Sequence, residues 1–555
     1  MPTVALTGSG RLPGYSMRWT FSPDPAAPPS PTSRRVLVLL SGAAVVHLVL
    51  AWLTRIPALS WGEDDAAYIL LAQQLRHFGY REIQDIAAPI HARFPPGYPL
   101  IIALLGWPFS DATDALLAFN MLFSVATIAL IYLSARRHLG ERIALLTAVL
   151  FAINPMSIWD STHVMAEAPF KFLMMLGVWA LTREDDDSRY AGLAGGAILA
   201  SALTRSAGLF LLPALGLYWL LKRRYRWVAL FVVASLCTVG AWTAWTLVAP
   251  EPEHRRLYVS AVVPQGSGRP RTGFLVDQLL RLPARTRRLL TIVFPFVLSF
   301  PSIPRTSIDN WLSLGALVGL GGTGVILMLR RWTTAALITL CYGSLLLVWR
   351  YAVERFANPL VPFLLAAMLL GVDWLMQRFA PRHRAWGTAA LVVLLTIGAT
   401  QLNASRLATA LGCDRQDPVE SACWDASYRD YLKAARWVRD STPPSAVFFV
   451  NKERGFYLHS GRLTINQDRA LQEDSLSLAG FLRASGARYT VATTVGLRAA
   501  QHDRLLASAC RDFVLLQTFP SATLVLRLRE PTDAPDDDSG CRALATYRNA
   551  TRSSE

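Results

Sequence analysis

Charged residues are scarce in this chain of 555 residues: 17% of them are Asp, Glu, Lys or Arg, whereas 52% are hydrophobic. A soluble globular chain usually carries about 25% charged residues. The mean hydropathy is +0.31, and long apolar runs alternate with short Arg-rich breaks. The shortage of charge therefore excludes an ordinary soluble protein and indicates a polytopic membrane protein.

Three other features are missing from the sequence. It has no Gly-rich phosphate loop of the kind that a nucleotide-sugar enzyme uses. It has no internal repeat, and so no sign of the inverted halves found in many transporters. It has no nucleic-acid-binding motif, so we attribute the net charge of +16 to the topology signals of Lys and Arg at the ends of the apolar runs.

Cysteine is also rare, with six residues in the chain. Cys237 and Cys341 lie inside apolar runs, where a cysteine packs as a small apolar side chain. The other four lie in the polar C-terminal part of the chain: Cys413, Cys423, Cys510 and Cys541. An even number in one segment predicts two disulfides in an oxidising compartment. Four cysteines allow three pairings, and the sequence does not choose among them.

The apolar runs predict about eleven transmembrane helices, because each span needs about 20 apolar residues. The expected spans cover residues 36–54, 114–134, 141–155, 167–182, 190–204, 206–221, 227–248, 309–329, 333–349, 357–376 and 385–402. Basic residues favour the cytoplasmic side, which the pairs Arg34–Arg35 and Arg136–Arg137 then occupy. We expect a multi-pass protein of the plasma or inner membrane, with a cytoplasmic N-terminus.

Three regions follow from this topology. Residues 1–35 are rich in Pro and Ser and are expected to be a disordered cytoplasmic N-terminus. Residues 36–402 form the transmembrane domain, with external loops at 55–113 and 249–308. Residues 403–555 alternate between helix-like and strand-like segments and predict a small extracytoplasmic α/β domain.

Finer expectations concern three segments of the external side. Helical apolar spacing from Ala66 to Phe78 predicts an amphipathic helix that lies on the membrane surface. Residues 156–166 are expected to form a short external loop. The acidic, Pro-containing tail from about residue 530 is expected to be loose.

Acidic residues lie at the external mouths of two spans. Glu63, Asp64 and Asp65 follow the first span, and Glu167 begins another. Removing a carboxylate from water near a bilayer is costly, so these acids are either solvated or functional. The simpler alternative is that they cap helices. His163 lies four residues before Glu167, which leaves open a metal site made from His163 and an acid.

Arginines share this external face, although topology favours the opposite one. Arg93, Arg205, Arg350 and Arg355 all fall there. Each could simply extend toward lipid headgroups. Together they place several cations beside the acids, and Arg binds phosphate oxygens well. The combination indicates chemistry on a phospholipid-like substrate at the membrane surface.

Six motifs then appear in order along residues 36–380. They are DDAAY at 64–68, PPGYPLIIAL at 95–104, RRHLGER at 136–142, NPMSIWDSTHVMAE at 154–167, LTRSAGLFLLP at 203–213 and ERFANPLVP at 354–362. In this set the chain resembles the membrane glycosyltransferases with the C-type fold, in particular bacterial relatives of protein O-mannosyltransferases and of aminoarabinose lipid A transferases. The C-terminal α/β domain also looks like those appended to such enzymes.

The resemblance implies an enzyme that takes a sugar from a polyprenyl-phosphate donor on the extracytoplasmic face. The acceptor is then a lipid, a glycan or a protein of the cell envelope. The rival interpretation is a membrane transporter or a lipid-sugar flippase. A transporter favours charges at mid-membrane, whereas the acids here lie at span ends. A related ligase that uses a diphosphate-linked oligosaccharide also stays open.

Site residues follow from the same resemblance. Asp64 is implied as catalytic, with Asp65 beside it, and Glu167 takes the place of the second-loop acid. Arg93, and with it Arg205 and Arg355, would bind the donor phosphate. Phe356 stands where some relatives have Tyr, so a hydroxyl contact to phosphate is absent. The use of a divalent metal varies among relatives, and the cofactor is left unknown. The expected reaction is one inverting displacement with Asp64 as general base.

Overall fold

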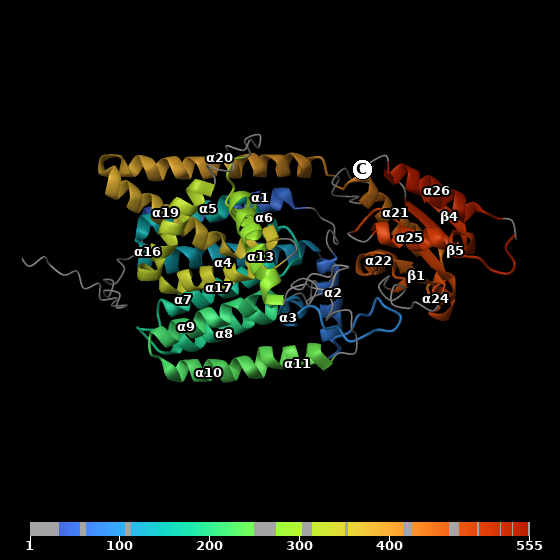
Figure 1. The fold of residues 1–555 in the computed structure, drawn as a ribbon, viewed down its shortest axis with the longest axis horizontal. Helices are drawn as coiled ribbons and strands as arrows, with labels where there is room; N and C mark the ends of the chain where they lie inside the picture. Colours follow the sequence, from blue (N-terminus) through green and yellow to red (C-terminus); the bar gives the residue numbers. More distant parts are fainter. Residues whose placement is uncertain are drawn as a thin grey trace, which may run out of the picture.

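The computed structural model shows a helical body followed by a C-terminal domain built on a β-sheet (Figure 1). It describes residues 33–55, 63–105, 113–248, 274–301, 314–349, 353–413, 419, 424–465, 477–496, 499–521, 523–534 and 537–552. The predicted disordered N-terminus therefore lies almost wholly outside the described residues, as do parts of the predicted external loop 249–308.

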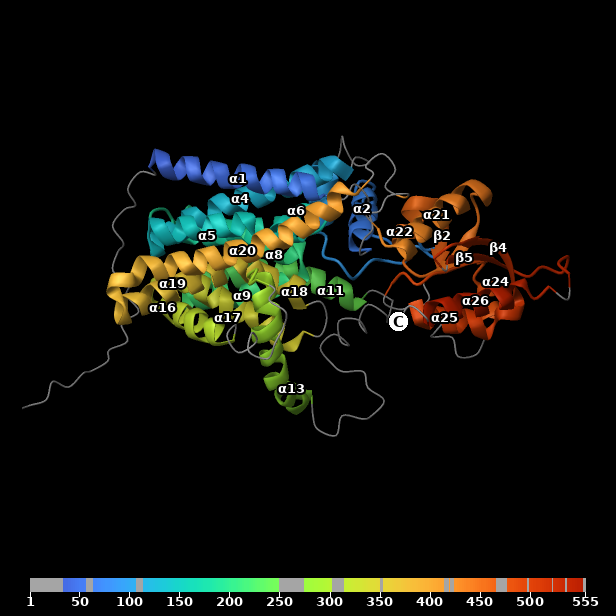
Figure 2. The ribbon, with the colours of Figure 1, turned by 90° about the horizontal axis from the view of Figure 1, so that it is seen from above.

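The helical body follows the apolar runs of the sequence. Its first part contains α1 (Arg34–Thr54), α2 (Asp64–Leu75), α3 (Gly97–Leu105), α4 (Thr113–Leu139), α5 (Glu141–Ile153), α6 (Pro155–Ser161), α7 (Glu167–Leu181), α8 (Arg189–Thr204), the 3-10 turn η1 (Ser206–Phe210) and α9 (Leu211–Leu221). Its second part contains α10 (Tyr225–Ser235), η2 (Leu236–Gly240), α11 (Ala241–Val248), α13 (Phe274–Arg288), η3 (Leu289–Val293), α14 (Phe294–Val297), η4 (Leu317–Gly322), α16 (Thr323–Arg331), α17 (Thr333–Val348), α18 (Val353–Ala357), η5 (Asn358–Leu360), α19 (Val361–Phe379), η6 (Pro381–His383) and α20 (Arg384–Leu411). Most run side by side along one axis, whereas α13 projects away from the bundle (Figure 2).

Six helices among the described residues are long and apolar enough to cross a membrane, or seven if the bent pair α5–α6 is one span. The predicted spans 206–221 and 333–349 correspond to shorter apolar helices. Burial differs sharply among the helices of the bundle. In the 18-residue apolar stretch of Glu354–Phe379, 78% of the residues are buried within the protein, but in that of Tyr225–Leu247 only 11% are. An apolar helix surface that the protein does not cover is suited to lipid. The count of about eleven spans stays a prediction.

Ion pairs mark the end of the bundle that lies away from the C-terminal domain. Arg137 pairs with Asp186 at 2.7 Å, and Lys222 pairs with Asp185 at 3.6 Å. The Arg-rich turns that the sequence predicts on the cytoplasmic side therefore lie together at one end.

The prediction of an external loop at 156–166 is wrong in its first half, because residues 155–161 form helix α6. The side chain of Asn154 accepts hydrogen bonds from the backbone N–H groups of Met156 and Ser157. Pro155 occupies the first turn of α6. A backbone N–H there would have no partner within the helix, so the N–H that proline lacks is not needed. The pair α5–α6 bends by 58° at this point, so α6 enters the bundle and carries Asp160 into it.

The helix predicted on the membrane surface from Ala66 to Phe78 is instead mostly buried. Helix α2 covers Asp64–Leu75, and residues 65–72 are all buried. Its packing partners are α3 and α22 (Glu453–Ser460) of the C-terminal domain. Figures 1 and 2 show α2 between the bundle and that domain. Its apolar residues on every side are explained by contacts with both neighbours, which periodicity alone does not reveal.

The C-terminal domain is a five-stranded mixed sheet with the strand order β2-β1-β3-β5-β4. The strands are β1 (Val447–Val450), β2 (Leu463–Ile465), β3 (Tyr489–Ala492), β4 (Phe513–Phe519) and β5 (Thr523–Leu528). Around the sheet lie α21 (Ala426–Ser441), α22, α24 (Leu478–Ala484), α25 (Ala499–Ser508), the short turn η7 (Cys510–Asp512) and α26 (Ser539–Arg552). Strands β1, β2 and β3 pair in parallel, whereas β5 is antiparallel to β3 and β4.

Two boundary predictions in this domain need correction. Helix α20 continues to Leu411, nine residues beyond the predicted boundary at 402. The tail predicted as loose forms α26, which a disulfide between Cys510 and Cys541 attaches to the domain. Cys413 is also disulfide-bonded, while Cys423 lies outside the described residues. Cys237 and Cys341 are the free cysteines of the described chain.

Candidate functional site

Five of the predicted site residues form one continuous chain of ion pairs. Arg355 Nη1 lies 2.7 Å from Asp64 Oδ2, and Arg355 Nε donates to Glu167 Oε1. Arg205 Nη1 lies 2.9 Å from the same Glu167 oxygen. Arg93 approaches the other oxygen of Asp64 at 3.9 Å. These five residues, which we call the ion chain, come from five separate segments of the sequence.

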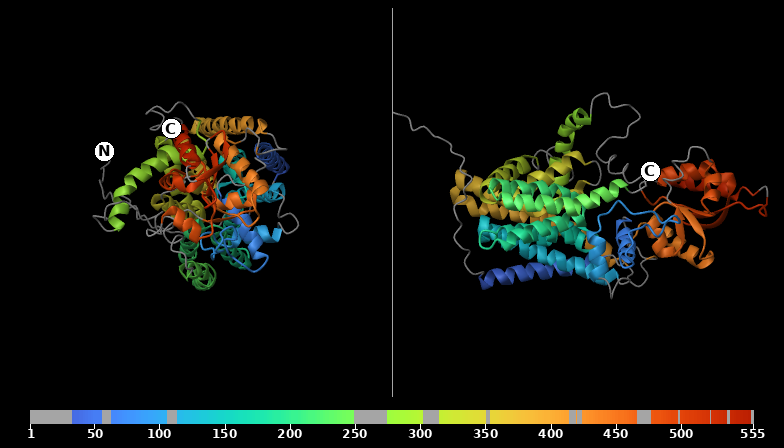
Figure 3. Two further views of the ribbon diagram at one scale, coloured as in Figure 1. Left: turned by 90° about the vertical axis from the view of Figure 1, so that its right-hand side faces the viewer. Right: turned by 90° about the horizontal axis from the view of Figure 1, so that it is seen from below.

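The residues of the ion chain lie at helix termini, or between two helical segments, at one end of the bundle. Asp64 begins α2, Glu167 begins α7, and Arg355 lies in the short helix α18. Arg205 occupies the break between α8 and η1, where its backbone is extended with φ −150° and ψ 129°. Acids at helix N-termini are favoured by the helix dipole, so part of their placement is local. This end of the bundle faces the C-terminal domain (Figure 3).

The charges of the ion chain are only partly exposed. Side-chain exposure is 0% for Glu167 and 8% for Arg205, and 16% for Asp64. Burial by itself raises the pKa of Asp64, but the guanidinium groups of Arg355 and Arg93 outweigh it and hold the pKa below its usual value. Three arginines around two carboxylates leave an excess of positive charge, which suits an anionic ligand.

One carboxylate oxygen of the ion chain lacks a hydrogen-bond partner among the described residues. This oxygen, Glu167 Oε2, is buried. An unsatisfied buried acceptor costs about 1–3 kcal/mol or more. A ligand hydroxyl at this position would remove that cost.

Aromatic rings surround the ion chain. The guanidinium of Arg205 lies over the Phe356 ring at 4.6 Å, so this ring holds a cation although it lacks the hydroxyl of a tyrosine. Arg93 lies over the Phe94 ring at 4.9 Å. Tyr68 packs against Phe94 with ring centroids 4.9 Å apart. These contacts orient two of the three arginines.

Asp65 and His163 are placed differently from the ion chain. Asp65 is 5% exposed, and its Oδ1 accepts from the backbone N–H of Ala66 at 2.8 Å. His163 Nδ1 lies 2.9 Å from the Trp159 carbonyl and 2.9 Å from the Thr162 hydroxyl. Within the described part of the chain, no three His, Cys, Asp or Glu side chains are grouped to hold a metal ion.

Glu63, next to Asp64, has an unusual backbone and an unusual pKa. Its φ of 67° lies in the left-handed region, which is strained for a residue with a side chain. Burial, together with the negative charge of Glu453, raises its pKa to about 8. Its pKa is thus shifted in the direction opposite to that of Asp64, which follows it.

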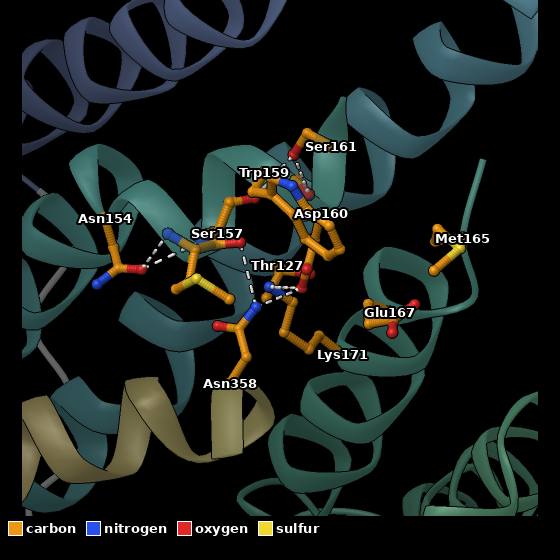
Figure 4. A network of polar contacts seen from close by, with 12 residues as sticks. Thr127, Asn154, Ser157, Trp159, Asp160, Ser161, Met165, Glu167, Lys171 and Asn358 are labelled. Atoms are coloured by element: carbon orange, nitrogen blue, oxygen red, sulfur yellow. Dashed lines mark hydrogen bonds and ion pairs between the residues drawn. The ribbon is translucent and has the colours of Figure 1, made fainter. Parts of the chain in front are cut away.

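Sequence reasoning missed a second polar cluster behind the ion chain (Figure 4). Lys171 Nζ lies 2.8 Å from Asp160 Oδ2, with side-chain exposures of 1% and 0%. Asn358 Nδ2 donates to the same oxygen at 2.6 Å. Figure 4 shows Lys171 and Asn358 approaching Asp160 from two different elements.

This cluster connects segments that carry two residues of the ion chain. Lys171 lies one helical turn after Glu167 on α7, and Asn358 lies three residues after Arg355. Asp160 therefore connects α7, which carries Glu167, with η5, which directly follows the helix of Arg355. The available signal was a lone lysine inside an apolar span, which is rare unless it is paired.

We expect Lys171→Met to destabilise the protein by about 3–5 kcal/mol, because it leaves the buried Asp160 carboxylate uncompensated. Thermal unfolding in detergent would measure this loss. The double variant Asp160→Asn/Lys171→Met should recover much of it, since no buried charge remains. Arg137→Met is the matched control: it breaks the more exposed pair with Asp186 and should cost about 0–1 kcal/mol. Equal losses from both arginine and lysine variants would contradict the role of the buried pair.

Comparison with known proteins is consistent with this geometry. Residues 93–250 match the family model described as dolichyl-phosphate-mannose-protein mannosyltransferase. That segment includes Arg93, Glu167 and Arg205. No curated protein sequence matches the chain.

Solved structures resemble the chain over nearly its full length. One is ArnT from Cupriavidus metallidurans bound to undecaprenyl phosphate, with 14% identity, 90% of this chain and 99% of that chain covered, and a TM-score of 0.53. Another is the oligosaccharyltransferase of Archaeoglobus fulgidus tethered with an acceptor peptide, with 14% identity, 92% and 78% covered, and a TM-score of 0.52. At such identities the likeness establishes the fold.

The family match and the fold agree with the resemblance drawn from the sequence motifs. They support an enzyme with a lipid-linked sugar donor over a transporter. The chain is a multi-pass membrane protein with the C-type glycosyltransferase fold, and its residues 93–250 are similar to the protein mannosyltransferase family.

Proposed function

We propose that the protein moves a sugar from a polyprenyl-phosphate donor to an acceptor hydroxyl of the cell envelope, on the extracytoplasmic face of the cell membrane. The observation that carries this proposal is the ion chain at the end of the bundle that faces the C-terminal domain. It has the excess positive charge that a lipid phosphate requires. The presence of undecaprenyl phosphate in the ArnT structure supports a donor of this class.

The proposed reaction is a single displacement with inversion. The acceptor oxygen attacks the anomeric carbon while its proton passes to Asp64. The bond between the anomeric carbon and the phosphate oxygen breaks, and polyprenyl phosphate leaves with the electron pair. Arg93, Arg205 and Arg355 stabilise the charge that develops on this phosphate.

The pairing of Asp64 with arginines gives the base a switch that depends on the donor. In the structure described here, Arg355 and Arg93 lower the pKa of Asp64 and make it a weak base. A donor phosphate would share these guanidinium groups and reduce their hold on the carboxylate. The pKa of Asp64 would then rise, so it would become a stronger base only when the donor is bound.

Glu167 has two roles in this proposal. Its Oε1 holds Arg205 and Arg355 in place. Its open Oε2 accepts a hydrogen bond from a hydroxyl group of the donor sugar or of the acceptor. A carboxylate that accepts from a sugar hydroxyl both orients the sugar and removes the cost of its own unsatisfied oxygen.

The proposed orientation places the N-terminus in the cytoplasm and the C-terminal domain outside. The Arg-rich turns at the opposite end of the bundle support it, because basic residues favour the cytoplasmic side. The disulfide between Cys510 and Cys541 fits an oxidising compartment.

Mass analysis of the envelope lipids, glycans and proteins of a deletion strain tests the proposal and identifies the acceptor. We expect one sugar substituent to disappear, to return with the wild-type protein, and to stay absent with Asp64→Asn at equal expression. An unchanged envelope in the deletion strain, or full recovery with Asp64→Asn, would contradict the proposed function.

A further inference from the structure

The first external loop joins the sheet of the C-terminal domain. Residues 81–90 form a small hairpin in which Arg81 bridges Ile90, and Asp85 bridges Thr464 of β2 in parallel. The backbone N–H of Thr464 donates to the Gln84 carbonyl at 2.8 Å, and that of Ile86 donates to the Thr464 carbonyl at 3.1 Å. The hairpin thus continues the sheet beyond β2, and Gln84 is 1% exposed.

A buried ionic link accompanies this junction. Arg454 of α22 donates through Nη2 to both oxygens of Glu82, at 3.0 and 2.9 Å. Glu82 Oε1 in turn lies 2.9 Å from His91 Nδ1. These three residues are between 0% and 7% exposed. Charge-assisted hydrogen bonds between groups so well shielded from water are stronger than neutral ones.

The link ends at the backbone beside Arg93. The N–H of Phe94 donates to His91 Nε2 at 2.8 Å, and a backbone N–H can only donate. His91 Nε2 is therefore the unprotonated nitrogen, so Nδ1 carries the proton and donates to Glu82. This tautomer closes a tight turn over residues 91–94, with Arg93 inside it. The turn is also held by Trp245, whose Nε1 donates to the His91 carbonyl at 3.1 Å.

We propose that Arg454, Glu82 and His91 are positioning residues, through which the C-terminal domain fixes the Arg93 turn beside Asp64. The inference deepens the proposed function, on which it rests: Arg93 contacts the donor phosphate, and these residues act on the donor only through Arg93. The C-terminal domain is then part of the donor site. Its separation from the hairpin would remove the support that Arg454 and Glu82 give to the Arg93 turn.

Hydrogen–deuterium exchange tests the link without any substrate. In Arg454→Met, exchange of the peptide that covers residues 91–98 should rise about tenfold or more, because a hydrogen bond to a charged group is removed two contacts away. Arg454→Lys should recover part of the protection, since it keeps the charge. Arg488→Met is the matched control: this arginine of the same domain is 72% exposed and pairs with Glu530 at the surface. Unchanged exchange at 91–98 in Arg454→Met would overturn the proposal.

The kinetic consequence separates positioning from catalysis. With a polyprenyl monophosphate sugar as donor, Arg454→Met should raise the donor KM about tenfold, because Arg93 contacts the phosphate of the bound donor. It should lower kcat by a smaller factor, because Arg93 also stabilises the leaving phosphate while Asp64, Arg205 and Arg355 are untouched. A lower kcat with an unchanged donor KM would overturn the inference. If Arg454→Met disrupts the C-terminal domain, Glu82→Gln, on the other side of the link, decides by the same two measurements.

Binding of unglycosylated polyprenyl phosphate distinguishes a failure of this inference from a failure of the proposed function. The lipid should raise the melting temperature of the wild-type protein, and this shift should shrink in Arg454→Met. Equal shifts in both would reject the link between domain and donor site while the proposed function stands. No shift even in the wild type would instead count against the donor class, and with it the inference that depends on it.

Discussion

Asp64→Asn should lower the rate of sugar transfer by roughly 10²-fold or more while the protein stays folded, because Arg355 keeps Glu167 as its partner. Asparagine has almost the same shape, and Asp64 is the first residue of α2 and not its N-cap, so the exchange removes no cap. It cannot accept the proton of the acceptor hydroxyl. Expression, thermal stability and transfer rate must be measured on the same preparation, because loss of stability together with activity would indicate a structural role.

Asp65→Asn is the neighbouring comparison for this experiment. Asp65 accepts from the backbone N–H of Ala66 at 2.8 Å, whereas Asp64 pairs with Arg355 and Arg93. We therefore expect a smaller loss of activity than in the Asp64 variant. Equal losses would mean that the two carboxylates act together, and wild-type turnover in Asp64→Asn would reject Asp64 as the general base.

Arg355→Gln should lower kcat/KM for the donor on the order of 10²-fold or more. Arg355 contacts both Asp64 and Glu167, so its removal takes away a phosphate ligand and also leaves two carboxylates without their shared cation. Loss of one partner from a largely buried charge pair typically costs about 2–5 kcal/mol. For Arg355→Lys we expect a kcat/KM between those of the wild type and Arg355→Gln, because an ammonium group keeps the charge but not the planar fork.

The matched control for this substitution lies at the other end of the bundle. Arg384 pairs with Asp373 at 2.6 Å and is far from the ion chain in the fold. Arg384→Gln should leave the donor kinetics unchanged. If Arg355→Gln bound and used the donor normally, the assignment of donor phosphate to this arginine would be wrong.

The helices of the bundle could be predicted because their signal is local. A long apolar run such as residues 36–54 must become a helix in lipid, where every backbone group needs an internal partner. The site acids and arginines could be predicted too, because charges at the mouths of spans are costly unless they have a use. Their convergence is described by the structure, whereas their catalytic roles stay a proposal.

Other features depend on contacts between distant segments and left no local signal. Helix α2 has apolar residues on all sides because α22 packs on it, almost 400 positions later in the chain. Asp160 looks like a loop acid until Pro155 and Asn154 start a helix that carries it to Lys171. The acidic tail is ordered as α26 through the bond between Cys510 and Cys541, and the sequence left that pairing open.

Sugar transfer by the purified protein in lipid nanodiscs is the direct test of the proposed reaction. The protein would receive a radiolabelled sugar on polyprenyl monophosphate together with an envelope fraction as acceptor. We predict that label enters the acceptor, that polyprenyl phosphate is released in equal amount, and that Asp64→Asn prevents both. Release of no polyprenyl phosphate, or movement of the intact labelled lipid between leaflets without transfer, would contradict the proposed reaction.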